Sequence, residues 1–254
     1  MILGLEFPPI SHVVEWPTLF GDGPFAVNKV VILMWVSAAI AFTVMFLGGR
    51  TRALVPTGVQ NVAESALDFI EDGIVLQTIG PDGLKYTPFL LTLFTFVLTC
   101  NVWGLIPGVQ MPVNARIALP AFMAIIVYLL YHYVGIRSQG PIGYMKSIMF
   151  MPGVPKVMYL LLTPIELVTK FISQPLSMAV RLFANMLAGH LLLVSFAVIT
   201  AAVFKVGATL VIFPFSFGLL VFLSMFEVLV AFLQAYIFTI LAAVYIASAM
   251  HPEH

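Results

Sequence analysis

Charge and cysteine are scarce in this chain of 254 residues. Only 11 Lys or Arg and 11 Asp or Glu side chains are present, 9% of the sequence, and Cys100 is the single cysteine. Soluble domains carry about 25% charged residues, so an ordinary water-exposed globular surface is excluded. One cysteine cannot form an internal disulfide or a multi-cysteine metal site. We interpret Cys100, which lies in an apolar run, as a packing residue.

Three further absences narrow the function. The basic and acidic side chains cancel to a net charge of zero, so no net field favours nucleic acid. No P-loop sequence is present for nucleotide phosphates, so no nucleotide site is expected in this chain. The first residues do not follow the basic and then apolar pattern of a signal peptide. We expect no nucleic-acid binding, no bound cofactor and no metal site in this chain.

Apolar residues, in contrast, make up 61% of the sequence and gather in long runs. A helix that crosses a membrane needs about 20 such residues. Three runs of that length predict three spans: residues 27–49, 86–106 and 116–136. Residues 1–26, before the first span, are expected to form an extramembrane arm.

Two later runs, 159–204 and 208–250, are too long for simple spans. As helices, Thr163 to Phe204 would extend roughly 60 Å and Pro214 to Met250 roughly 55 Å, about twice the thickness of the hydrocarbon layer. Each run either breaks into two spans or forms one steeply tilted helix. Because no charged loop interrupts them, we favour a tilted hairpin joined near residues 205–207, with a kink at Pro175.

Residues 56–79 follow a different pattern, because apolar side chains recur there at helical spacing while acids occupy another face. This segment is expected to lie on the membrane surface, either without chemistry of its own or as a docking site for a partner chain. The predicted fold is therefore a single all-α membrane domain, residues 1–254, with about five spanning helices and one surface helix.

The positive-inside rule sets the expected orientation. Basic residues 50 and 52 follow the first span, which places that end in the cytoplasm and the N-terminus outside. The C-terminus then also lies in the cytoplasm. Six basic residues face inward on this topology, at positions 50, 52, 85, 137, 146 and 156, and three face outward, at positions 29, 116 and 205.

Arg181 is the only basic residue between Phe171 and Phe204. A charge at the bilayer centre costs roughly 2.5–3.5 kcal/mol and usually marks an ion pathway. Snorkelling to the surface does not suit a residue so far from either end of the run. Residues 181–186 read RLFANM, and residues 188–190 read AGH. This stretch resembles the signature of subunit a of F-type ATP synthases from bacteria, in particular actinobacteria. Subunit a is the stationary proton-channel subunit of that family.

One face of the predicted helix carries Arg181 among small and amide side chains. At about 100° per residue, residues within about 40° of Arg181 include Gln174, Ser177, Asn185 and Ala188, whereas His190 falls on the opposite side. Small residues let a neighbouring helix approach closely in a membrane. The resemblance implies that this neighbour is a rotating ring of carboxylate-bearing helical hairpins, the c-ring.

Glu227 and Gln234 are seven residues apart and share one stripe of the last helix. Residues 234–239, QAYIFT, with Val244 and Tyr245, resemble the C-terminal signature of the same family. The resemblance implies that Gln234 lies beside Arg181, and that His190 and Glu227 form a coupled pair in the outer half-channel. The residues alone also allow simpler roles: a hydrogen-bonded core histidine, a structural acid and a helix–helix hydrogen bond.

Glu166 and Lys170 are spaced for an ion pair along one helix. The resemblance offers Glu166 a place on the proton pathway instead. It further implies a non-catalytic channel subunit that translocates H⁺, in contact with lipid and peripheral stalk subunit b and, indirectly, the F1 sector. A secondary transporter is the alternative, but it predicts inverted repeats around a midplane pocket, which the sequence lacks. A purely structural scaffold would leave Arg181 without a role.

Overall fold

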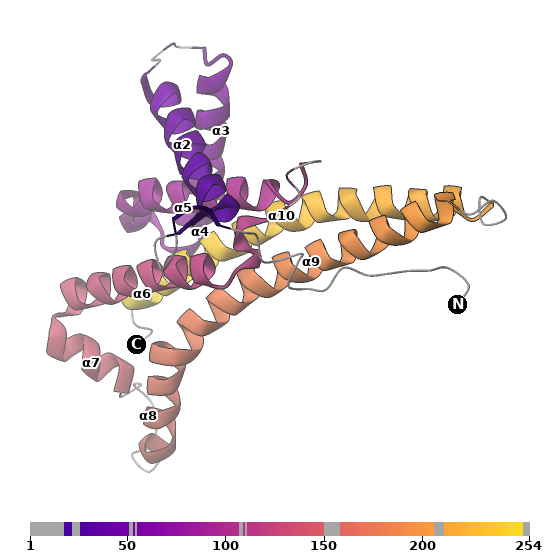
Figure 1. Cartoon of the computed structure of the whole chain (residues 1–254). Coiled ribbons are helices and arrows are strands. Elements are labelled where there is room, and N and C mark those ends of the chain that lie inside the picture. Colours follow the sequence, from indigo (N-terminus) through magenta and orange to yellow (C-terminus); the bar gives the residue numbers. More distant parts are fainter. Residues whose placement is uncertain are drawn as a thin grey trace. The chain divides into compact units, whose positions relative to one another are not determined.

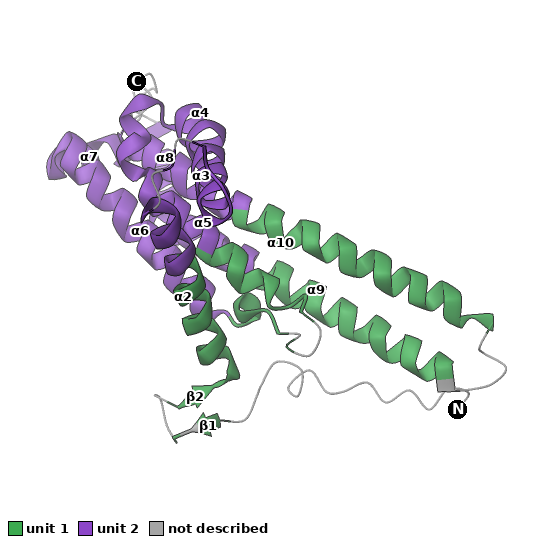
Figure 2. Cartoon of the chain, turned by 90° about the horizontal axis from the view of Figure 1, so that it is seen from above, with its two compact units in different colours: residues 1–41, 96–116, 183–235 green, residues 42–95, 117–182, 236–254 purple. Residues whose placement is uncertain are grey.

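The computed structural model describes residues 18–21, 26–50, 53, 55–106, 109, 111–149, 158–205 and 211–250. The chain divides into two compact units (Figure 2). Unit 1 comprises residues 1–41, 96–116 and 183–235, and unit 2 comprises residues 42–95, 117–182 and 236–254. Much of the predicted arm 1–26, the join at 206–207, Arg52, Lys156 and the C-terminal residues 251–254 lie outside the described residues.

Five helical segments of the described chain are long and apolar enough to cross a membrane. Three have 22 residues, or about 33 Å at 1.5 Å per residue; the other two have 46 and 38 residues. This arrangement confirms the predicted all-α membrane fold. The segments are α2 (Lys29–Arg50), the 3₁₀ turn Pro81–Tyr86 with α5 (Thr87–Val102), α6 (Ala118–Gln139), α8 (Tyr159–Val168) continuing into α9 (Gln174–Lys205), and α10 (Phe213–Met250).

Within unit 1, the parts of α9 and α10 run side by side (Figures 1 and 2). Near the end of α9 and the start of α10, the hydroxyl oxygens of Thr200 and Ser216 share a hydrogen bond of 2.7 Å in a buried position. A hydroxyl pair of this kind satisfies two polar groups that lipid could not. The long helices therefore form the expected hairpin, while its tilt in a membrane stays a prediction.

Unit 1 also contains a short antiparallel pair of strands that the sequence analysis did not predict. Strand β1 (Thr18–Phe20) pairs with β2 (Val27–Asn28), and α2 begins directly after β2. The first spanning helix consequently starts at Lys29, two residues after the predicted boundary.

Within unit 2, the predicted surface segment forms α3 (Val59–Ile70), a π-helical turn (Glu71–Val75) and α4 (Leu76–Thr78). Only part of its apolar face packs within the protein. Ile70, Ile74 and Val75 are fully buried, whereas other apolar side chains remain exposed. The exposed ones are Val59, Val62, Leu67, Phe69 and Leu76. This segment is not among the helices that could span a membrane, and its place on the membrane surface stays a prediction.

Helix α7 (Pro141–Met149) is a second element that the sequence analysis did not predict. Gly140 ends α6 with a φ of 75°, a left-handed conformation that glycine adopts without steric cost. Pro141 then starts α7, because proline suits the first turn of a helix. Tyr144 and Ile148 of α7 are buried, at 4% and 1% exposure, so tertiary packing stabilises a helix too short to be stable alone.

The end of the second span and the position of the predicted kink need correction. The second span ends at Val102 instead of residue 106, since residues 103–105 form a turn. The irregularity near Pro175 lies just before it, where Thr169–Ser173 form a π-helical turn. Proline has no N–H and its ring crowds the carbonyl four residues earlier. A wider turn directly before Pro175 accommodates both effects.

Candidate functional site

Arg181 lies on the exposed side of α9. In the unit 2 part of this helix, Met178, Ala179 and Leu182 are buried, at 2%, 4% and 0% exposure, whereas Ser177 and Arg181 are exposed. Among the described residues, Arg181 forms no hydrogen bond or ion pair. Arginine keeps its charge under all ordinary conditions. The positive charge of Arg181 therefore has no ion-pair partner among the described residues, although its helix is long and apolar enough to cross a membrane.

The exposure along α9 follows the predicted helical face. Asn185 and Ala188 are exposed like Arg181, Gln174 is half-buried, and His190 is buried at 6% exposure. The exposed side chains are small or polar, so a second helix could approach that side of α9 closely. Which molecule contacts this face stays a prediction.

In unit 1, Glu227 of α10 lies against the backbone of α9 beside His190. Glu227 is 8% exposed, and a methyl group on Gly189 would overlap its carboxylate. Only glycine therefore permits this close approach without rearrangement. None of the hydrogen bonds or ion pairs of the described residues joins His190 to Glu227. The structure makes them neighbours across Gly189 rather than a directly bonded pair.

Gln234 is held by a hydrogen bond from the neighbouring long helix. The Asn185 side-chain nitrogen donates to the Gln234 side-chain oxygen at 2.7 Å, within unit 1. The Gln234 nitrogen is buried without a hydrogen-bond partner. Glu227, Ala231 and Gln234 are all buried at helical spacing on α10, as the predicted stripe requires. A buried donor without a partner is costly. Gln234 therefore carries one unsatisfied hydrogen-bonding group in this stripe.

Sequence reasoning missed three residues of this arrangement: Gly189, Asn101 and Asn114. The Asn114 side-chain nitrogen donates to the Asn101 oxygen at 2.7 Å, and the Asn101 nitrogen donates to the Ala231 carbonyl at 3.1 Å. Both asparagines are 1% exposed. An amide inside an apolar run was the available signal for Asn101, because a buried amide needs partners. The network fixes the end of α5 to α10 between Glu227 and Gln234.

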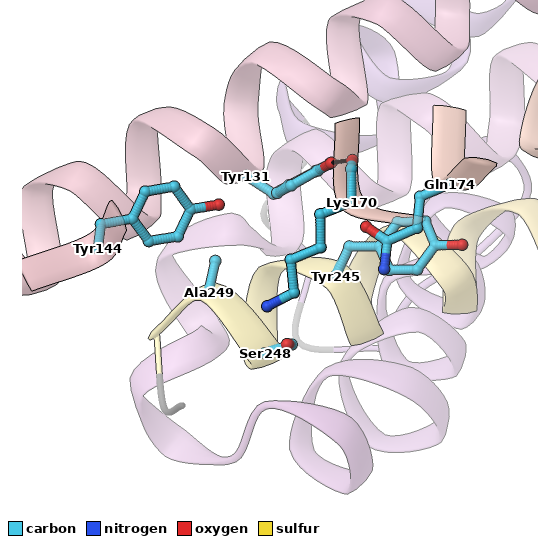
Figure 3. A pocket seen from close by; sticks show the side chains of 7 residues that line it. All are labelled: Tyr131, Tyr144, Lys170, Gln174, Tyr245, Ser248 and Ala249. Carbon is cyan, nitrogen blue, oxygen red and sulfur yellow. Dashed lines mark hydrogen bonds between the residues drawn. The ribbon is translucent and has the colours of Figure 1, made fainter. Parts of the chain in front are cut away.

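Glu166 and Lys170 do not form the ion pair that their spacing allowed. The hydrogen bonds and ion pairs of the described residues include none between them. Glu166 lies in α8 and Lys170 in the π-helical turn that follows, so the four-residue spacing of an α-helix no longer applies between them. Lys170 instead lines a pocket with residues of α6, α7 and α10 (Figure 3). Both side chains are half-buried.

The chemistry available to these residues is proton exchange and fixed charge. A carboxyl group and an imidazole can each take up and release a proton, whereas a guanidinium cannot. The described residues hold no group of three or more His, Cys, Asp or Glu side chains that could bind a metal ion. The arrangement thus combines two buried titratable side chains, His190 and Glu227, with one exposed permanent charge, Arg181.

Comparison with known proteins gives one consistent family. The profile of the ATP synthase A chain matches residues 31–247. ATP synthase subunit a of Frankia alni is 40% identical over 97% of this chain and 87% of its own length, and that of Rhodococcus erythropolis is 38% identical over 97% and 90%. The subunit a of Mesorhizobium japonicum is 36% identical over 96% and 95%. The chain belongs to the ATP synthase A chain family, as the resemblance of residues 181–190 predicted.

Proposed function

We propose that this chain is the proton-translocating stator subunit of the Fo sector of a rotary ATP synthase. It provides two offset half-channels and a fixed positive charge between them. The observation that carries the proposal is Arg181, an exposed guanidinium without a partner among the described residues on a membrane-spanning helix. Such a charge needs an anion from outside the chain. A carboxylate on a passing ring helix supplies it.

The action of Arg181 follows from electrostatics. A ring carboxylate must carry its proton while it faces lipid, because an anion there is costly. Within about 4 Å of Arg181, at an effective dielectric constant near 20, the anion gains about 4 kcal/mol. The ring site therefore releases its proton to the outlet side, passes Arg181 as an anion and takes a proton from the inlet side. Because the guanidinium holds its own protons, it also blocks a direct leak.

The proposed inlet half-channel runs along α9 and α10. Glu227 and His190 exchange protons there, and the Asn185–Gln234 hydrogen bond supports the polar surroundings through which protons reach the ring. Glu166, near the start of the long segment, is assigned to the pathway on the other side of Arg181. The face of α9 that carries the half-buried Gln174 and the exposed Ser177, Arg181 and Ala188 contacts the ring.

The proposed partners and orientation complete this assignment. The c-ring contacts α9, subunit b of the peripheral stalk holds the chain, and the F1 sector is reached only indirectly. The translocated ion is H⁺, and this chain needs no cofactor of its own. In the bacterial plasma membrane the N-terminus lies outside and the C-terminus in the cytoplasm, because the basic residues favour that side.

The decisive test replaces Arg181 in the whole ATP synthase, reconstituted in vesicles. Arg181→Ala should reduce proton-driven ATP synthesis by about a thousandfold, because about 4 kcal/mol of electrostatic stabilisation is lost and each 1.4 kcal/mol is a factor of ten. Arg181→Lys should not restore synthesis, since an ammonium lacks the rigid guanidinium fork. The complex should still assemble, because the side chain makes no hydrogen bond or ion pair within the described residues.

Arg137→Ala is the matched control. Arg137 is exposed in the last turn of α6, and within the described residues its side chain donates only to the Tyr133 hydroxyl, at 3.3 Å. Its removal should change synthesis by less than about twofold, as for most surface substitutions. Normal synthesis by Arg181→Ala in an assembled complex would refute the proposed function.

A further inference from the structure

The connection between α5 and α6 runs into the interior of unit 1. Residues 111–115 are all buried, and Val113–Ala115 form only a short 3₁₀ turn. Connections between helices usually run over the surface, because buried irregular backbone has polar groups that need partners. In a membrane, such backbone occurs only where protein surrounds it or where it lines a water-filled cavity. This buried connection is therefore a structural part of unit 1.

Two hydrogen bonds hold the connection against α2 within unit 1. The Trp103 side-chain nitrogen donates to the Ser37 hydroxyl at 2.7 Å, and the Lys29 ammonium donates to the Val109 carbonyl at 2.9 Å. Ser37 is fully buried. Bonds at both places restrict the backbone that leads to residues 111–115, so the polar side chain in this buried segment has a fixed starting point.

That side chain is Asn114, and it orients the amide of Asn101 on α5. The Asn101 oxygen accepts from the Asn114 nitrogen at 2.7 Å, while the Asn101 nitrogen donates to the Ala231 carbonyl at 3.1 Å. A turned Asn101 amide would place its oxygen against that carbonyl, and neither group could donate. Asn114 thus keeps the donor of Asn101 directed at α10.

The surface of α10 at this contact consists of alanine. Ala231 and Ala235 are buried, at 1% and 0% exposure. Small side chains let helices approach closely in a membrane, which leaves the Ala231 carbonyl within reach of Asn101. Methyl groups also form shallow ridges, so their packing restricts sliding and rotation of α10 less than large side chains would. The directed hydrogen bond from Asn101 supplies a restriction that the packing lacks.

The position of this bond matters for the proton path. The Ala231 carbonyl lies between Glu227 and Gln234, on the same buried stripe. A slip of α10 by one residue would turn the stripe by about 100°. Gln234 would then lose the hydrogen bond from Asn185. Glu227 would likewise leave its place against Gly189. One bond at Ala231 therefore fixes both contacts between α10 and α9.

We propose that Asn101 and Asn114 form a positioning clamp for the inlet half-channel. Asn101 sets the rotation and height of α10, and Asn114 orients Asn101. Neither residue exchanges protons, because an amide does not titrate. The inference rests on the proposed function, since it assigns the clamp to the proton path along α9 and α10. It adds the buried connection 111–115 to the segments that this path requires.

The test uses the whole ATP synthase reconstituted in vesicles, with F1 removed before measurement. Two quantities are measured: passive proton conductance per assembled membrane sector, and the midpoint of thermal unfolding of that sector. Asn101→Leu should lower conductance at least about tenfold, because a misplacement of about 1 Å at a reacting group can cost about a hundredfold. Asn114→Leu leaves the donor of Asn101 in place but unoriented, and should lower conductance by a smaller factor.

The double variant, Asn101→Leu with Asn114→Leu, separates positioning from stability. Replacing both partners of a buried hydrogen bond by apolar groups of similar shape is nearly neutral for stability. The unfolding midpoint should therefore return to within about 2 °C of the native value. Conductance should stay as low as in Asn101→Leu, because the bond to Ala231 is still absent.

Thr200→Val is the matched control. It also removes a buried hydrogen bond to α10, the one with Ser216 at 2.7 Å, but outside the stretch between Glu227 and Gln234. Conductance should remain within about twofold of the native value, because sites without shared partners act nearly independently.

The clamp is overturned if the double variant regains conductance together with stability, or if Asn101→Leu conducts as well as Thr200→Val. Should Asn101→Leu alone not assemble, the double variant decides. A double variant that also fails to assemble overturns the clamp, because the pair is then required for folding itself. A native sector that conducts no protons contradicts the proposed function instead, so the two failures are distinguishable.

Discussion

Arg181 and Glu227 are both ionisable residues deep within long apolar helices, yet Arg181 is exposed and Glu227 is buried. Arg181 is exposed and has no hydrogen bond or ion pair within the described residues, whereas Glu227 is buried against Gly189. A carboxyl group can become neutral by taking a proton, so it can be buried. A guanidinium cannot lose its charge, so it must find an anion. The buried acid is thus suited to proton exchange and the exposed arginine to contact with a partner.

The surroundings of the two residues differ in the same way. Beside Glu227, the α10 stripe is fixed by the Asn101–Ala231 and Asn185–Gln234 hydrogen bonds. Around Arg181, the exposed neighbour Ser177 is small. A fixed polar stripe keeps donors and acceptors in place for proton transfer, whereas a smooth exposed face permits a partner to slide. Three experiments can test this difference between Arg181 and Glu227.

Among these three experiments, the largest loss of proton conductance is expected from removing the carboxyl group of Glu227. Glu227→Gln should reduce passive proton conductance through the membrane sector by about a hundredfold or more, the usual contribution of a general acid or base. Exchanging the residues, with His190→Glu and Glu227→His together, should return conductance to within about tenfold of the native value, because one acid and one imidazole again lie on either side of Gly189. Backbone and rotamer differences prevent full recovery.

Both single variants must be compared with the exchange. If the double variant conducts no better than the worse single variant, the two residues do not act as a coupled pair, and each needs a separate explanation. The same set should be measured for ATP synthesis, where the order of the variants should be the same.

A smaller effect is expected from crowding the acid without removing it. Gly189→Val must displace the Glu227 carboxylate, since even a methyl group would overlap it. The carboxylate is the flexible end of its side chain and can move aside, but a misplacement of about 1 Å at a reacting group can cost about a hundredfold in rate, so conductance should fall about tenfold. Gly218→Val is the control, because nothing lies within 4 Å of a methyl group there. Equal conductance in the two variants would show that the close approach to α9 has no functional role.

The smallest effect on activity is expected from cysteine probes of the two faces. In a background with Cys100 replaced, single cysteines at the exposed positions 177 and 185 should form cross-links to cysteines on the outer helices of the ring. A cysteine at the buried position 190 should not. Activity before cross-linking should remain within about twofold for the exposed positions, as for most surface substitutions. Efficient cross-linking at 190 with none at 177 or 185 would reverse the assignment of the faces.

Much of the fold was predictable because its signals are local. The lengths of the apolar runs predicted the five spans, since a bilayer sets the length of helix that it accepts. Helical periodicity predicted that His190 lies opposite Arg181, and the exposures of the two residues agree with it. The short elements gave no such signal: α7 is stabilised by buried Tyr144 and Ile148, and β1 by a partner strand.

Within the candidate site, the sequence by itself determined which residues can titrate and which face of the helix each occupies, because both properties follow from side-chain chemistry and a repeat of 3.6 residues. Only the tertiary structure decided that Glu227 approaches Gly189, that Asn101 and Asn114 hold α10, and that Lys170 faces a pocket instead of Glu166. These contacts join segments up to 130 residues apart. They depend on how helices pack, which no local pattern in one sequence specifies.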